Sequence, residues 1–196
     1  MLRVSAVIGV LVAGNAVAAA SVQVRAFVDK RSSGYNATLV VQARHGGSDW
    51  RNVVLGPVAL ADGISSVRTW GNRVAWVRHS NLGYDAALHC VQVDENLHAS
   101  TVVLGPASLG ARGIHNVTLI GNALAWVTQQ NVGYREELNC VVINRRGYAR
   151  HVVFGPRCLA HKIRRVILTG REIRWVASSR GGDERNYSET LPRPRD

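Results

Sequence analysis

The sequence predicts an all-β fold of about three and a half four-stranded repeats, each about 50 residues long, arranged like the blades of a propeller. One observation is internal repetition: SNLGYDAALHC, Ser80 to Cys90, returns as QNVGYREELNC, Gln130 to Cys140. A second is composition, because short runs of β-branched and aromatic residues alternate with glycine and proline. No segment has a convincing helical period, which excludes a mixed fold.

Each repeat contains four expected strands, here called A to D. In the copy with the clearest spacing, A spans about Ile64 to Thr69, and Gly71-Asn72 forms a tight turn, since both residues tolerate positive φ. B follows over Arg73 to Arg78 and C over Tyr84 to Val93. D is expected over Thr101 to Leu104, where the following Gly-Pro ends the sheet because proline cannot donate to a ladder.

Strand B carries a tryptophan at the same place in three copies, Trp76, Trp126 and Trp175. Aromatic side chains bury large areas, so we expect these rings to pack between adjacent sheets. Phe27 takes the equivalent place near the start of the repeats. The chain therefore supplies strands B, C and D, then two full units, then A, B and a candidate C around Tyr187 to Leu191.

This count leaves the closure of the fold open. The end strands can pair to complete a small ring, or a homodimer can complete a larger one, since propellers usually have four to eight blades. The alternative architectures are a three-fold, trefoil-like arrangement and an open repeat barrel.

The shared unit reads V-V-L-G-P, then I-x-x-V-x-x-x-G-N-x-x-A-W-V-x-x-x-N-x-G-Y-x-x-x-L-x-C. It resembles the blade repeats of bacterial extracytoplasmic β-propeller proteins of the TolB-like and YVTN type, over nearly the whole chain after the leader. The resemblance is generic, because the Ser-Pro-Asp-Gly turn of TolB blades is missing. It implies a propeller fold, export, and a binding or scaffolding role more often than an enzymatic one. It carries over no catalytic residue.

The two ends differ in composition from the repeats. Residues 1–20 have a basic start, an apolar run and an A-x-A end, which are the parts of a secretory signal peptide. We therefore expect a secreted or periplasmic protein with its repeat domain over residues 21–177 and no membrane span. Residues 178–196 form a polar segment that we expect to fray.

Charge and cysteines restrict the partners only weakly. The formal net charge is +11, which permits weak binding to polyanions, but a solvated basic surface explains it as well. We see no run of basic residues interleaved with aromatics, as single-strand binders usually have. Three cysteines in an exported chain predict one disulfide and one free thiol, with the pair among Cys90, Cys140 and Cys158 left open.

Catalytic and metal-binding motifs are missing, so we predict no cofactor, no metal site and no catalytic residue. The repeated loops offer a different chemistry, because asparagine and tyrosine together can hydrogen-bond and stack on a sugar. The candidate ligand-binding residues are Asn81, Tyr84, Asn131 and Tyr134.

The function that we predict is a secreted, propeller-like binding or scaffold module that recognises a glycan or a protein partner through its rim loops. The alternative is a secreted hydrolase or lyase whose site lies in the central funnel.

Overall fold

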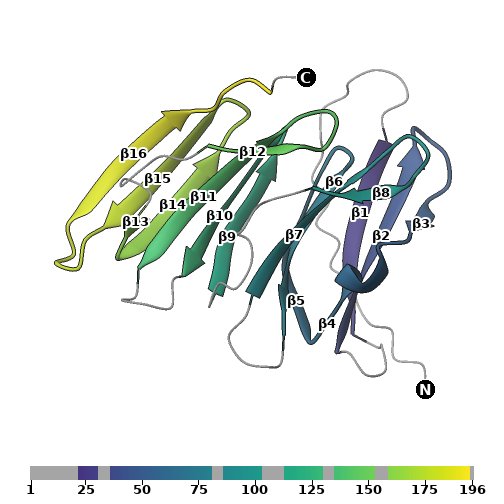
Figure 1. Cartoon of the computed structure of the whole chain (residues 1–196), viewed down its shortest axis with the longest axis horizontal. Coiled ribbons are helices and arrows are strands. Elements are labelled where there is room, and N and C mark those ends of the chain that lie inside the picture. Colours follow the sequence, from purple (N-terminus) through teal and green to yellow (C-terminus); the bar gives the residue numbers. More distant parts are fainter. Residues whose placement is uncertain are drawn as a thin grey trace.

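The computed structural model consists almost entirely of antiparallel β-sheet (Figure 1). It describes residues 22–30, 36–80, 86–102, 113–129, 135–152 and 159–194. Within these ranges the one helical element is the short 3₁₀ turn η1 (Gly56–Ala59), at the first Gly-Pro pair. The all-β repeat fold predicted from the sequence is confirmed.

Four sheets follow one another along the chain. Their strands have the following bounds. The first sheet contains β1 (Val22–Asp29), β2 (Ala37–His45), β3 (Arg51–Val53) and β4 (Leu60–Ala61). The second contains β5 (Gly63–Trp70), β6 (Arg73–His79), β7 (Ala86–Val93) and β8 (Ala99–Thr101).

The other two sheets continue the series. The third contains β9 (Gly113–Ile120), β10 (Ala123–Gln129), β11 (Glu136–Ile143), β12 (Ala149–His151) and β13 (Leu159–Ala160). The fourth contains β14 (Lys162–Leu168), β15 (Glu172–Ser178) and β16 (Glu184–Thr190).

The main strands agree with the expected series of B-C-D, two full units and A-B-C, and the two-residue strands β4 and β13 are additional. Two further details differ. Strand D of the second sheet is β8, Ala99–Thr101, which lies earlier than the expected Thr101 to Leu104. Residues 184–190 pair along the whole of β15 as β16, so this part of the expected frayed tail is instead ordered strand. Composition alone predicted a frayed segment here because the strand is polar. Its outward residues are polar because they cover the outer face of a terminal sheet.

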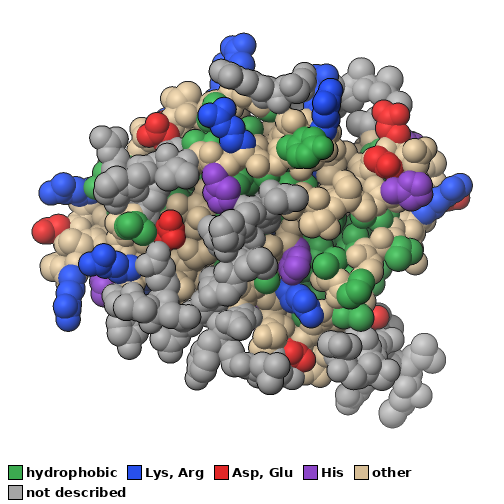
Figure 2. Space-filling view, in the orientation of Figure 1, with side chains coloured by type: hydrophobic (Ala, Val, Ile, Leu, Met, Phe, Trp, Pro, Cys, Tyr) green, Lys and Arg blue, Asp and Glu red, His purple; other side chains and the backbone are tan. Residues whose placement is uncertain are grey.

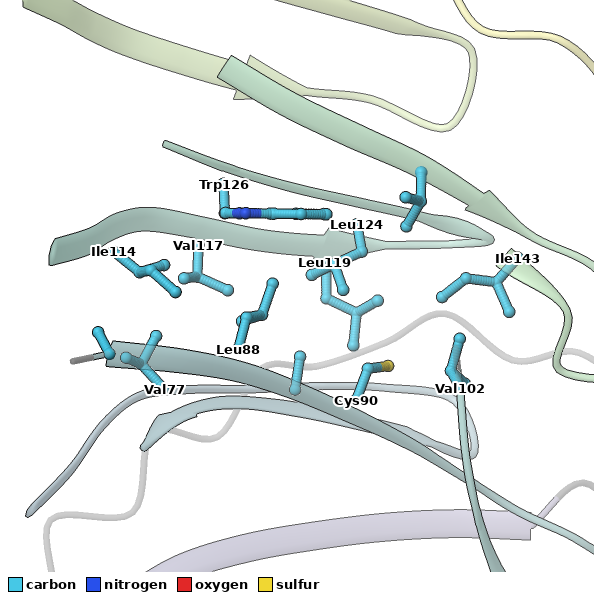
Figure 3. Close-up of a cluster of buried hydrophobic side chains, with 13 residues drawn as sticks. Val77, Leu88, Cys90, Val102, Ile114, Val117, Leu119, Leu124, Trp126 and Ile143 are labelled. Atoms are coloured by element: carbon cyan, nitrogen blue, oxygen red, sulfur yellow. The ribbon is translucent and has the colours of Figure 1, made fainter. Parts of the chain in front are cut away.

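The sheets stack face to face as an open series and do not close into a ring (Figure 1). The first and fourth sheets lie at opposite ends of the stack, so among the described residues the end strands do not pair to complete a ring, which was one of the closures left open. Three hydrophobic clusters fill the three junctions between neighbouring sheets. At the central junction, side chains of the second and third sheets point toward one another (Figure 3).

Tryptophan seals each junction, as the sequence predicts. Trp76, Trp126 and Trp175 are at most 1% exposed, and each packs between its own sheet and the preceding one. Cys90 and Cys140 occupy equivalent positions but belong to different junctions, so these two do not pair. No disulfide occurs among the described residues, and Cys158 lies outside them.

Candidate functional site

The four residues proposed from the sequence fall outside the described parts of the chain. Asn81 and Tyr84 follow β6 and precede β7, and Asn131 and Tyr134 occupy the matching connection between β10 and β11. The structure therefore does not test them, and their role in sugar binding stays a prediction.

A hollow lies at the opposite rim, where the turns between strands A and B and between strands C and D come together. Its volume is about 300 Å³, and it sits where the second sheet meets the third. Glycine supports this geometry, since Gly71 and Gly121 have φ values of +58° and +59° at the two A–B turns. The lining residues are Trp70, Gly71, Asn72, Arg73, Gln92, Gly121, Asn122 and Arg145.

Arg73 is the central residue of this hollow. It begins β6 and is only 6% exposed. Its Nε donates to Gln92 Oε1 at 2.9 Å within the second sheet. Its Nη1 donates to Asn122 Oδ1 at 2.8 Å and to the Gly121 carbonyl at 3.2 Å, and its Nη2 donates to the Asn144 carbonyl at 3.0 Å. The guanidinium therefore joins the second sheet to two turns of the third.

Gln92 fixes the second wall of the hollow. Its Oε1 accepts from Arg73, and its Nε2 donates to the Arg145 carbonyl at 2.7 Å. The latter bond holds the β11–β12 turn against β7. Asn72 is also held, because its Nδ2 donates to the Val93 carbonyl at 2.7 Å. Most polar groups of the hollow are thus positioned before any ligand arrives, which lowers the entropy cost of binding.

The charged side chains that line the hollow are all positive. Every hydrogen-bond acceptor of Arg73 is a neutral amide oxygen, and no Asp or Glu lines the hollow. Burial lowers the pKa of the Arg73 guanidinium, with Cys90 opposing the shift. Burial also raises the pKa of the Cys90 thiol to about 12, so the sulfur carries no negative charge near neutral pH. The positive charge of Arg73 is left without a counter-ion from the described lining.

Comparison of the repeats shows that stacking does not require this charge. The register places Arg73 opposite Gln92 in the second sheet and Ala123 opposite Val142 in the third. The third sheet packs on the fourth through this apolar pair. Because the third sheet packs with an apolar pair at the same position, the packing of sheets does not by itself explain why Arg73 and Gln92 are polar.

The hollow can bind an anion but offers no groups for acid–base chemistry. Two arginines, two asparagines and a glutamine provide donors suited to a carboxylate, sulfate or phosphate oxygen. Trp70 adds an aromatic side chain that is 43% exposed beside them. No group of three His, Cys, Asp or Glu residues able to hold a metal ion occurs in the described ranges. Nor does any helix in these ranges have the length and apolar character to cross a membrane.

The repeat pattern does not reveal this site, because the pattern contains only the residues that the copies share. The signal lies where they differ, at Arg73 and Gln92. It also lies in the β11–β12 turn, where two adjacent arginines, Arg145 and Arg146, precede Gly147. Compared with known proteins, the chain matches no protein-family model and no curated protein.

Proposed function

We propose that this chain is a binding module that recognises an anionic group of a glycan or protein partner at the Arg73 hollow. One observation carries the proposal: a nearly buried guanidinium has only neutral acceptors and lies beside a second arginine, Arg145, in an open hollow. A bound anion would stabilise a guanidinium held in this way, since hydrogen bonds between two charged groups are stronger than those to neutral oxygens.

The proposal keeps the class predicted from the sequence but moves the contact to the other rim. The alternative hydrolase or lyase needs a central funnel, and the sheets form an open stack. Export and the resemblance to TolB-like and YVTN-type blades remain predictions. So does the homodimer.

The experiment is an array of carboxylated, sulfated and neutral glycans together with acidic and neutral peptides, probed at low and high salt. We expect anionic probes to be retained as salt rises, because a partly buried charge is screened less than a surface charge. Binding that disappears at high salt for every probe would leave only diffuse attraction to a basic surface and would contradict the proposal.

Two variants of the same turn locate the binding. Arg145→Ala removes an exposed arginine that lines the hollow, and Arg146→Ala removes its exposed neighbour that does not. We expect about tenfold weaker binding from the first, the value of one charge-assisted hydrogen bond, and no change from the second. Equal effects from both would indicate that net charge alone matters.

A second test alters the buried pair. The double variant Arg73→Ala with Gln92→Val copies the apolar pair found one sheet further on, so the variant should keep the stacked fold. We expect it to lose anion binding while its circular dichroism stays that of the parent. Retained binding by the folded variant would exclude Arg73 as the anchor.

A further inference from the structure

The outer face of the first sheet presents a second, separate set of arginines. Alternate residues of β1 and β2 point away from the core, while their neighbours, such as Leu39 and Val41, fill the first junction. This sheet is the end of the stack, so no other sheet covers this side (Figure 1). We use the name outer face for the set Gln23, Arg25, Phe27, Gln42, Arg44, Trp50 and Asn52.

A hydrogen-bond ladder crosses the outer face. Arg25 Nε donates to Gln42 Oε1 at 2.8 Å, and Gln42 Nε2 donates to Asn52 Oδ1 at 2.8 Å, so the ladder spans β1, β2 and β3. Arg44 Nε donates to Gln23 Oε1 at 3.0 Å in the next cross-strand pair. The two arginines are therefore diagonal neighbours whose side chains are held by amide oxygens.

Trp50 holds the same two guanidiniums. The Arg25 group lies 4.4 Å from the centroid of the Trp50 ring, and the Arg44 group lies 4.5 Å from it. Both distances are within the range of a cation–π contact. Because each planar guanidinium is stacked and hydrogen-bonded through Nε, its terminal Nη groups are pre-oriented for a ligand.

Both charged residues of the outer face are arginines, and Asp29 lies on the same side of β1, two positions beyond Phe27. No ion pair among the described residues involves Arg25 or Arg44, and two like charges on neighbouring sheet positions repel each other. The outer side of the fourth sheet differs, since Arg174 pairs with Glu172 at 2.7 Å and Arg164 with Glu184 at 3.8 Å. Figure 2 shows Asp and Glu near Lys and Arg at both ends of the molecule, so the contrast between the two outer sides rests on these ion pairs. If the outer face served only to keep the end of the stack soluble, mixed charges of this kind would be sufficient.

We propose that the outer face of the first sheet binds an acidic polysaccharide that carries carboxylates on successive sugar rings. The guanidiniums of Arg25 and Arg44 would accept the carboxylates in bidentate contacts, a geometry that lysine cannot provide. The amides of Gln23, Gln42 and Asn52 suit sugar hydroxyls.

A sugar fits this face better than a nucleic acid does. Single-stranded nucleic acids stack successive bases on several open aromatic rings, and here guanidiniums cover the Trp50 ring and leave Phe27 as the open ring of the outer face. Phe27, which takes the place of the repeat tryptophan, is 43% exposed and offers an apolar surface for one sugar ring. The outer face shares no residue with the Arg73 hollow, so this inference stands independently of the proposed function.

The test measures binding of the full chain to polygalacturonate, with dextran as the neutral polysaccharide and oligo-dT as the nucleic acid. We expect retention on polygalacturonate at moderate salt and none on dextran. Oligo-dT bound as tightly as polygalacturonate would assign the face to nucleic acid and overturn the proposal. So would no binding of polygalacturonate.

Matched variants separate shape from charge. Arg25→Gln with Arg44→Gln should abolish binding, whereas Arg164→Gln with Arg174→Gln removes equal charge from the other end of the stack and should not. Arg25→Lys with Arg44→Lys keeps the charge but loses the planar fork, and we expect at least about tenfold weaker binding. Full binding by the lysine variant, or equal loss in the two glutamine variants, would contradict the proposal. These variants are compared in the Arg145→Ala background, so that anion binding at the hollow, which Arg145→Ala weakens, does not contribute to the result.

Discussion

At the scale of single residues, His89 shows how position in the stack sets a pKa. It lies opposite Trp76 across the β6–β7 pair, and the two rings stack with centroids 5.3 Å apart. Burial lowers the pKa of His89 from its ordinary 6.5, and the nearby Arg78 charge lowers it further. Its Nε2 has no hydrogen-bond partner within the described residues. The folded chain therefore favours the neutral ring.

This arrangement predicts that stability falls in acid. Because the folded state binds a proton at His89 less readily than the unfolded state does, the contribution of His89 is complete above about pH 6.5 and is lost as pH falls below that value. We expect the urea midpoint of the parent to drop between neutral and mildly acidic pH by more than that of a His89→Tyr variant. The last sheet provides the precedent for this variant, since Tyr187 stacks on Trp175 with centroids 5.4 Å apart. Parallel pH profiles for parent and variant would contradict the prediction.

At the scale of elements, the strand that begins each of the second, third and fourth sheets, β5, β9 and β14, contains a bulge that the apolar spacing of the sequence indicates. Apolar residues three apart, such as Ile114 and Val117, would face opposite sides of a regular strand. Both lie in the same cluster because Asn116 has φ of +53° and the register shifts there. Ser66 and Arg165 repeat the feature at equivalent positions, with φ of +53° and +51°. An apolar spacing of three within a predicted strand therefore indicates a bulge.

The outer side of the fourth sheet shows how the stack ends. Positions that are apolar in the third sheet, Ala125 and Cys140, correspond to Arg174 and Ser188 in the fourth. Similarly, Leu138 corresponds to Asn186. These replacements put charged and polar residues where a fifth sheet would pack, as expected of a capping repeat, and leave Ile167 as an exposed apolar side chain beside Arg174.

Restoring the apolar residues should therefore create an exposed apolar face through which two copies of the chain associate. We expect the triple variant Arg174→Ala, Asn186→Leu and Ser188→Cys to self-associate, because it carries the surface that the third sheet buries against the fourth. Analytical ultracentrifugation over a concentration series measures this. The control variant Arg164→Ala removes a charge from the same face but adds no equivalent apolar side chain. A triple variant with the sedimentation of the parent would show that these replacements do not end the stack.

At the scale of the whole molecule, the sequence predicted the main strands of each sheet but neither the two-residue strands β4 and β13 nor how the sheets close. The residues that the copies share, above all the tryptophans and the Gly-containing turns, determine the sheets and the junctions between them. Closure depends on the two outer faces, where the first sheet has Arg25 and Arg44 and the fourth has Arg174 and Asn186. These residues differ from the repeat, so a consensus cannot reveal them. The Arg73 hollow was missed for the same reason.

An open stack predicts that damage at one junction stays local. Each sheet packs only on its neighbours, so stability approximates a sum of sheet and junction contributions. Trp175 serves the terminal junction and Trp126 the central one. Replacing either by alanine removes a fully buried ring, which costs about 3–5 kcal/mol. The consequence should differ, because the fourth sheet has one neighbour whereas the second and third each have two.

Hydrogen exchange followed by mass spectrometry distinguishes the two cases. In Trp175→Ala we expect faster exchange in β14, β15 and β16 alone, with the first and second sheets as protected as in the parent. In Trp126→Ala we expect faster exchange on both sides of the central junction. The same loss of protection across all four sheets in both variants would mean that the chain unfolds as one cooperative unit, and stability would then not divide by junction. Faster exchange confined to the fourth sheet in Trp175→Ala would instead show that the open stack behaves as a one-dimensional series. In such a series the terminal sheet can detach while the Arg73 hollow, between the second and third sheets, stays intact.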